Sequence, residues 1–159
     1  MGKSLLQEFQ GLDGRRHLID ALTSQPLVAD RDLALAVEPR LRLEEAPAGT
    51  NLIQEGASDT DLLLILRGAV SIAVDGRVVA RRTAGDHVGE MAMVDPVTPR
   101  SASVVATSDS VVARIAEPDF SELADHYPRL WRRIALELAS LLRDGNAADH
   151  YREKTGRAA

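Results

Sequence analysis

The chain has 159 residues, a length typical of one domain, with 45% hydrophobic and 27% charged residues. Its formal net charge of −5 argues against a broad electrostatic grip on DNA or RNA, which needs a basic face. The absence of cysteine excludes a disulfide scaffold, a thiolate metal site and a cysteine nucleophile. The longest apolar run, residues 62–66, is far too short to span a bilayer, and the N-terminus lacks the apolar core of a signal peptide, so we expect a cytoplasmic protein.

Residues 1–38 form an N-terminal segment with helical patterns. Apolar residues recur at helical spacing twice before Pro26, first from Leu5 to Leu12 and then from Leu18 to Leu22. These positions are expected to pack against the core. Asp30 then precedes an Ala/Leu-rich stretch, which predicts a further short helix that ends near Pro39.

From residue 39 to 116 the pattern changes to short strands separated by turn residues, which is typical of an all-β sandwich or barrel. The hairpin prediction is firmest at residues 71–80, because Asp75-Gly76 supplies the positive φ angles of a type I′ turn. Valine and leucine pairs elsewhere supply further strands. We predict a mainly β fold with flanking helices, an eight-stranded jelly roll in which residues 85–104 form an excursion between two strands.

After residue 116 the period switches back to that of a helix. Phe120, Leu123 and Ala124 suit one short helix, and Pro128 stands where a longer helix would begin. Apolar residues recur at helical spacing in the longer helix, at Leu130, Ile134, Leu138, Leu141 and Leu142. Gly145 is expected to end it. Residues 117–144 are thus predicted to be helical, and residues 145–159 to form a polar tail or linker.

The excursion over residues 85–104 carries a lone carboxylate, Glu90, and a lone guanidinium, Arg100, separated by small, apolar or turn-forming residues. A guanidinium binds phosphate through parallel hydrogen bonds. Gly89 and the residues after it can begin a helical turn with free backbone N–H groups, and Glu90 is placed to accept from a sugar hydroxyl. The alternative is a surface ion pair worth about 0 to 1 kcal/mol. The spacing alone leaves both interpretations open.

Two runs in this excursion, residues 89–93 and 99–104, resemble the phosphate-binding cassette of the cyclic nucleotide-binding domain family. That family includes catabolite-activator-like regulators, cyclic-nucleotide-dependent kinases and gated channels. The resemblance implies that Glu90 binds the ribose 2′-hydroxyl and Arg100 the cyclic phosphate. Val88 stands where the family often has phenylalanine. The ligand-binding residues implied by the resemblance are Gly89, Glu90, Met91, Ala92, Arg100, Ser101 and Ala102.

The resemblance extends over residues 15–144, because the glycines of residues 47–70 fall in register with the strands and turns of the family. It implies a double-stranded β-helix, or jelly roll, with N-terminal helices and a C-terminal helix that acts as a lid over the base. In the family the lid helix commonly forms a dimer interface, so we expect a homodimer or higher oligomer.

Four residues of the lid region are candidates for contacting the base: Trp131, Arg143, Asp144 and Asn146. Trp131 fits a core anchor or a dimer contact at least as well. A charged residue near a helix end often interacts only with the helix dipole. The lid therefore yields candidates and no firm assignment.

Two segments, residues 17–22 and 127–139, resemble the N-terminal sensor half of bacterial effectors of pyrimidine cyclic nucleotide anti-phage (Pycsar) systems. Those effectors carry a C-terminal TIR domain that depletes NAD. The resemblance implies cUMP or cCMP as the ligand and a TIR domain in cis after a linker that begins near Gly145. A free-standing module that binds cAMP or cGMP is the alternative. Catabolite-activator-like regulators continue into a winged helix-turn-helix, for which residues 145–159 leave no room.

A metal-dependent cupin-like enzyme is the alternative of another class, because cupins are also jelly rolls. A cupin metal site needs clustered histidines with a nearby carboxylate, whereas the four histidines are scattered. His87 and Glu90 have a spacing that suits two metal ligands, but the sequence shows no third partner. It also has no Gly-x-Ser-x-Gly elbow, P-loop or deaminase-type zinc motif. The chain itself is therefore expected to be no enzyme and to hold no metal or cofactor.

Overall fold

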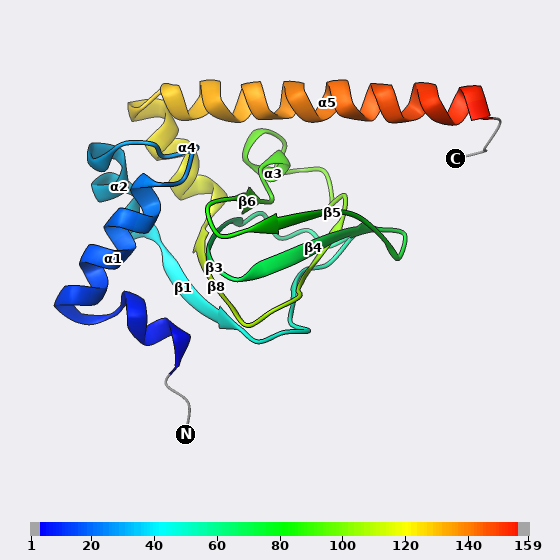
Figure 1. The fold of residues 1–159 in the computed structure, drawn as a ribbon. Coiled ribbons are helices and arrows are strands. Elements are labelled where there is room, and N and C mark those ends of the chain that lie inside the picture. The colour runs from blue at the N-terminus through cyan, green and yellow to red at the C-terminus, as the bar shows by residue number, and fades with distance from the viewer. Residues whose placement is uncertain (1–3, 156–159) are drawn as a thin grey trace.

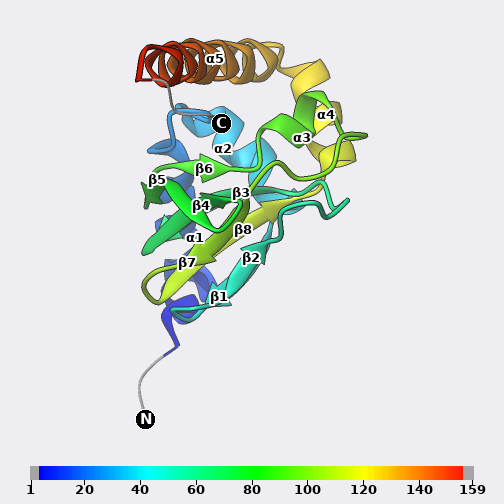
Figure 2. The same ribbon diagram turned by 90° about the vertical axis from the view of Figure 1, so that its right-hand side faces the viewer.

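Eight short strands form two four-stranded antiparallel sheets in the computed structural model, which describes residues 4–155 and the side chains of residues 4–144. The strand order is β1-β8-β3-β6 in one sheet and β2-β7-β4-β5 in the other (Figures 1 and 2). The strands are β1 (Arg42–Ala46), β2 (Asn51–Ile53), β3 (Leu62–Arg67), β4 (Ala69–Val74), β5 (Arg77–Thr83), β6 (His87–Val88), β7 (Ser103–Ala106) and β8 (Ser110–Ile115). This arrangement confirms the predicted jelly roll.

Strand β3 separates two hydrophobic cores. Leu63 and Ile65 point into the core between the two sheets, whereas Leu62, Leu64 and Leu66 belong to the core beneath the helices. Side chains alternate between the two faces of a strand. A strand that is buried on both faces therefore has a continuous run of apolar residues, as residues 62–66 do.

The N-terminal helices pack against the outer face of the β1-β8-β3-β6 sheet (Figure 1). They are η1 (Leu5–Phe9), α1 (Gly11–Thr23), α2 (Arg31–Val37) and η2 (Glu38–Arg40). The short helix predicted after Asp30 is present as α2, and Asp30 caps it, because its side chain accepts a hydrogen bond of 2.8 Å from the Leu33 N–H. The prediction that Leu12 packs inward with Leu5 and Phe9 is wrong. The chain is extended at Gln10, which breaks the helical register and leaves Leu12 90% exposed.

The hairpin between β4 and β5 turns at Asp75 and Gly76, whose φ angles are +51° and +77°. This confirms the predicted turn with positive φ at both central residues. Strand β5 lies at the edge of its sheet and leads directly into residues 85–104.

Two helices follow β8: α4 (Glu117–His126) and α5 (Arg129–Thr155). The expectation that Gly145 ends the second helix is wrong, because α5 continues through it to Thr155. A glycine inside a helix costs only about 1 kcal/mol relative to alanine, so one glycine without a following proline does not stop a helix. Residues 145–155, expected to form a tail or linker, therefore extend α5 beyond the sheets (Figure 1).

The beginning of α5 is fixed to the loop before α2. Arg129 pairs with Asp30 at 2.9 Å, and Arg133 Nη1 donates to the Val28 carbonyl at 2.6 Å. Leu130 and Ile134, which belong to the first two turns of α5, are buried. Within residues 4–155, no helix combines the length and the apolar character that crossing a membrane requires.

Candidate functional site

Residues 85–104 form one wall of a pocket beside the second sheet. After β6 the chain passes Gly89 and Glu90, makes the single helical turn α3 (Met91–Val94) and returns to β7. All seven residues that the resemblance assigns to the ligand line this pocket. Ile53, Ile72 and Val104 provide its apolar side. The fold therefore brings the predicted residues together.

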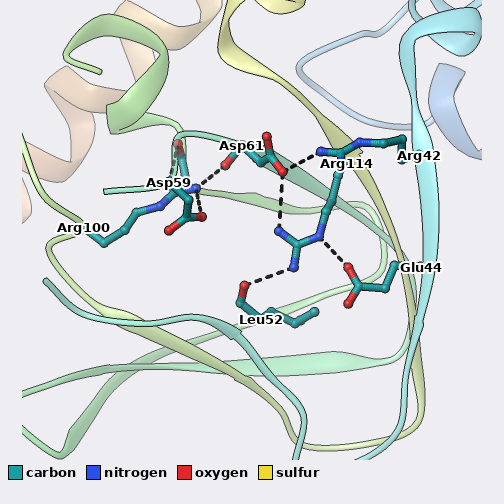
Figure 3. Close-up of polar contacts among 8 residues, drawn as sticks. Arg42, Glu44, Leu52, Asp59, Asp61, Arg100 and Arg114 are labelled. Atoms are coloured by element: carbon teal, nitrogen blue, oxygen red, sulfur yellow. Dashed lines mark hydrogen bonds and ion pairs between the residues drawn. The ribbon is translucent and has the colours of Figure 1, made fainter. Parts of the chain in front are cut away.

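Arg100 lies buried in the wall of the pocket, with 8% of its surface exposed. Its Nη2 donates to Asp59 Oδ2 at 3.0 Å and to the Asp61 carbonyl at 2.6 Å (Figure 3). Its Nη1 donates to the Gly89 carbonyl at 3.4 Å. The interpretation as a surface ion pair between Glu90 and Arg100 is therefore wrong, since the carboxylate that holds Arg100 is that of Asp59.

The Nε–H of Arg100 has no hydrogen-bond partner among the side chains and backbone that the structure describes. A buried donor without an acceptor costs about 1 to 3 kcal/mol, and more when it is charged. Two carbonyls and a carboxylate thus fix the guanidinium while one of its donors stays unsatisfied. A phosphate oxygen in the pocket would provide the missing acceptor.

Gly89 allows this close approach. Its φ is +87°, and a Cβ at this position would lie 2.8 Å from the Asp61 carbonyl oxygen and 2.9 Å from Arg100 Nη1. Real Cβ atoms essentially never come this close to other atoms. The glycine therefore gives the backbone its turn and leaves room for the guanidinium.

Asp61 connects the Arg100 end of the pocket to the first sheet (Figure 3). Its backbone carbonyl accepts from Arg100, and its carboxylate pairs with Arg42 of β1 at 2.7 Å and with Arg114 of β8 at 3.7 Å. Arg114 also pairs with Glu44. The loop before β3 thus holds Arg100 in a fixed position. The two aspartates of that loop were not predicted, because nothing in their local sequence indicates which arginine they contact.

Glu90 lies at the start of α3 and is partly buried. Burial raises the pKa of the Glu90 carboxyl above its usual range, and the neighbouring carboxylate of Glu137 acts in the same direction. A backbone hydrogen bond and the positive groups of His87 and Arg82 oppose the shift. Ionised Glu90 is therefore costly in the free protein. A ligand hydroxyl that donates to the carboxylate would offset this cost.

His87, at the start of β6, lies between Glu90 and Glu137 of α5. The imidazole is 8% exposed, and its Nε2 lies 2.5 Å from Glu137 Oε2. One ligand atom from each of the three residues lies within 4.8 Å of the others, so Glu137 is the third group that the sequence did not show. Two ligands of one zinc ion lie about 3.3 Å apart, since each lies about 2 Å from the metal. The 2.5 Å contact is accordingly a close charge pair, in which Nε2 makes no hydrogen bond of normal geometry.

The lid candidates lie elsewhere. Trp131 packs edge to face on Phe120 of α4 with ring centroids 5.6 Å apart, and its Nε1 donates to Asp125. It does not line the pocket and serves as an anchor between α4 and α5. Arg143 and Asp144 are exposed on α5 and do not line the pocket either. Asn146 lies outside the residues whose side chains are described.

Two residues near Glu90 were not predicted from the sequence: Arg82 on β5 and Glu137 on α5. Arg82 follows directly from the strand alternation that points Ala80 and Arg82 to the same side of β5. Glu137 sits on the helix predicted to be the lid. The alternation could therefore have indicated Arg82, whereas no local signal indicated Glu137.

Comparison with known proteins agrees with this geometry. The sequence matches the family described as the cyclic nucleotide-binding domain over residues 43–127. The Pycsar effector proteins XpPycTIR of Xanthomonas perforans and BcPycTIR of Burkholderia cepacia are each 43% identical to it over 143 residues. These matches cover 89% of this chain and 47% of each effector, so the chain spans about half the length of these relatives.

The catabolite activator protein of Thermus thermophilus has a similar structure, with a TM-score of 0.71 and 25% sequence identity. The match covers 82% of this chain and 62% of that one. The fold shared with these proteins is regulatory and not catalytic, in agreement with the expectation that this chain is no enzyme. Because the family model matches more than half of this chain, the chain belongs to the cyclic nucleotide-binding domain family.

Proposed function

We propose that this domain senses a 3′,5′-cyclic nucleotide by binding its phosphate at Arg100 and its ribose at Glu90. The observation that carries the proposal is the buried guanidinium, which is fixed by Asp59 and two carbonyls and retains an unsatisfied Nε–H. Ser101 and Ala102 follow Arg100 in the pocket wall and are small enough for phosphate oxygens to approach the backbone.

The part of the pocket at Glu90 suits a sugar. Glu90 offers an acceptor, and Gly89, Met91 and Ala92 line the wall beside it. A cyclic nucleotide carries its anion and its free 2′-hydroxyl on one rigid ring system. One carboxylate and one guanidinium in the wall of the same pocket match these two groups.

The identity of the base is the finer part of the proposal. The similarity to Pycsar effectors over 89% of the chain favours a pyrimidine nucleotide, cUMP or cCMP. Arg100 and Glu90 are directed at groups that all cyclic nucleotides share. Binding of cAMP or cGMP is therefore the alternative.

The relatives also support a proposal about the larger protein to which the sensor belongs. Because this chain spans about half of each effector, we infer a TIR domain in cis that hydrolyses NAD in anti-phage defence, in the cytoplasm. Occupancy would be transmitted through α5. Leu136 and Leu142, which are 60% and 69% exposed on α5, support a homodimer or higher oligomer through this helix.

A thermal-shift panel with cUMP, cCMP, cAMP and cGMP tests the proposal. A ligand that binds only the folded state raises the melting temperature in a concentration-dependent manner. We expect the largest shift with cUMP or cCMP. A larger shift with a purine nucleotide would contradict the pyrimidine assignment, and no shift with any of the four would contradict the sensor itself.

A further inference from the structure

Arg82 has an unusual position for an arginine, because it lies on the inner face of the edge strand β5. It pairs directly with Val70 of β4, which is fully buried in the core between the two sheets. Side chains that lie directly opposite one another on antiparallel strands share one face of the sheet. Arg82 therefore faces the interior, where it lines the pocket together with Ile72, whereas Arg81 is on the outer face and is exposed.

The guanidinium of Arg82 has few partners within the protein. Its Nη1 donates to the Arg81 carbonyl at 2.8 Å. Among residues 4–144, whose side chains are described, it takes part in no ion pair. Arg100, by contrast, is held by Asp59 and two backbone carbonyls. Arg82 thus keeps donors at Nε and Nη2 that can bind an acceptor in the pocket.

The base of a bound nucleotide would lie close to Arg82. Arg82 is one of the positive groups that lower the pKa of Glu90, so the two side chains belong to the same part of the pocket wall. In a nucleotide the 2′-hydroxyl and the base are attached to adjacent carbons of the ribose. A ribose that donates its 2′-hydroxyl to Glu90 therefore carries its base beside Glu90, within reach of the long side chain of Arg82.

We propose that Arg82 determines base specificity by donating a hydrogen bond to a carbonyl oxygen of the base. The proposal rests on the proposed function, because it requires the ribose at Glu90. Uracil, cytosine and guanine carry a carbonyl, which is a strong acceptor for a charged donor. Adenine has none and presents ring nitrogens and an amino group that is itself a donor. A donor of Arg82 that faces this amino group stays unsatisfied, which costs free energy. The site therefore disfavours cAMP.

The variant Arg82→Met removes the donors and the charge but keeps a long, flexible side chain in the pocket wall. By calorimetry we expect its affinity for cUMP and cCMP to fall about tenfold, the loss of one charge-assisted hydrogen bond, and its affinity for cAMP to change much less. Arg81→Met is the matched control, because it makes the same charge change on the outer face of β5, and it should bind as the wild type does. Unchanged affinities, or equal losses for all three nucleotides, would overturn the proposal.

A second measurement uses the wild type and does not depend on cAMP. The guanidinium N–H signals of Arg82 in ¹⁵N NMR, assigned by their absence from Arg82→Met, should shift on saturation with cUMP or cCMP, whereas those of Arg81 should not. Unchanged Arg82 signals in the saturated protein would overturn the base contact and leave the binding of phosphate and ribose intact. A wild type that binds none of the four cyclic nucleotides would overturn the proposed function, and the role of Arg82 with it.

Discussion

At the scale of single residues, Gly89 determines how closely Arg100 approaches the backbone. Gly89→Ala should weaken nucleotide binding, because the added Cβ would lie 2.9 Å from Arg100 Nη1 and displace the guanidinium. Its left-handed φ also costs about 1 to 2 kcal/mol of folding free energy with a Cβ present. Urea unfolding and calorimetry measure the two effects separately.

Gly85 provides the control for backbone strain. Its φ is +99°, but a Cβ there meets no atom within 4 Å. Gly85→Ala should lose comparable stability and keep the wild-type affinity. Equal affinity in the two variants would show that the space at Gly89 is not needed by the site.

Glu90 is expected to lower the stability of the free protein at neutral pH. Because its pKa is raised in the folded state, the native state binds more protons than the unfolded state once the pH exceeds the unfolded pKa. Stability is therefore lost as pH rises through this window. Glu90→Gln should be more stable than the wild type in urea near pH 7, and the difference should vanish below the unfolded pKa of about 4.3. A variant that is less stable at neutral pH would contradict this.

At the scale of elements, Asp30 serves two helices. It caps α2 through the Leu33 N–H and pairs with Arg129 at the start of α5. Asp30→Ala should lower the free energy of unfolding by about 1 kcal/mol, mostly through the lost cap. Asp30→Asn retains a capping oxygen and loses only a half-exposed ion pair, so it should remain close to the wild type. Equal losses in the two variants would assign the effect to the ion pair.

The elements that local chemistry dictates were predictable. The Asp75-Gly76 turn and the short helix after Asp30 follow from the preferences of the residues themselves, and the structure confirms both. Two other features could not be predicted from the preferences of single residues. The break at Gln10 exposes Leu12 although its spacing fits a helix, and α5 continues through Gly145 although glycine is typical of helix ends.

At the scale of the whole molecule, the site also combines residues that were predictable from the local sequence with residues that were not. The seven predicted residues lie within fourteen positions of one another in the sequence, so a local motif was enough to find them. Asp59, Arg82 and Glu137 come from a loop, an edge strand and the last helix, and only the tertiary fold brings them to the pocket. The motif was enough to predict the residues of the pocket wall, whereas the distant residues could not be predicted from it.

Calorimetric titration of the wild type and of Arg100→Ala with cUMP and cCMP tests the central claim most directly. A charge-assisted hydrogen bond is worth about 1.5 to 3 kcal/mol, so the variant should bind one to two orders of magnitude more weakly. Arg16→Ala, which removes an exposed arginine from α1, should bind as the wild type does. The same affinity for the wild type and Arg100→Ala would contradict the assignment of Arg100 to the phosphate.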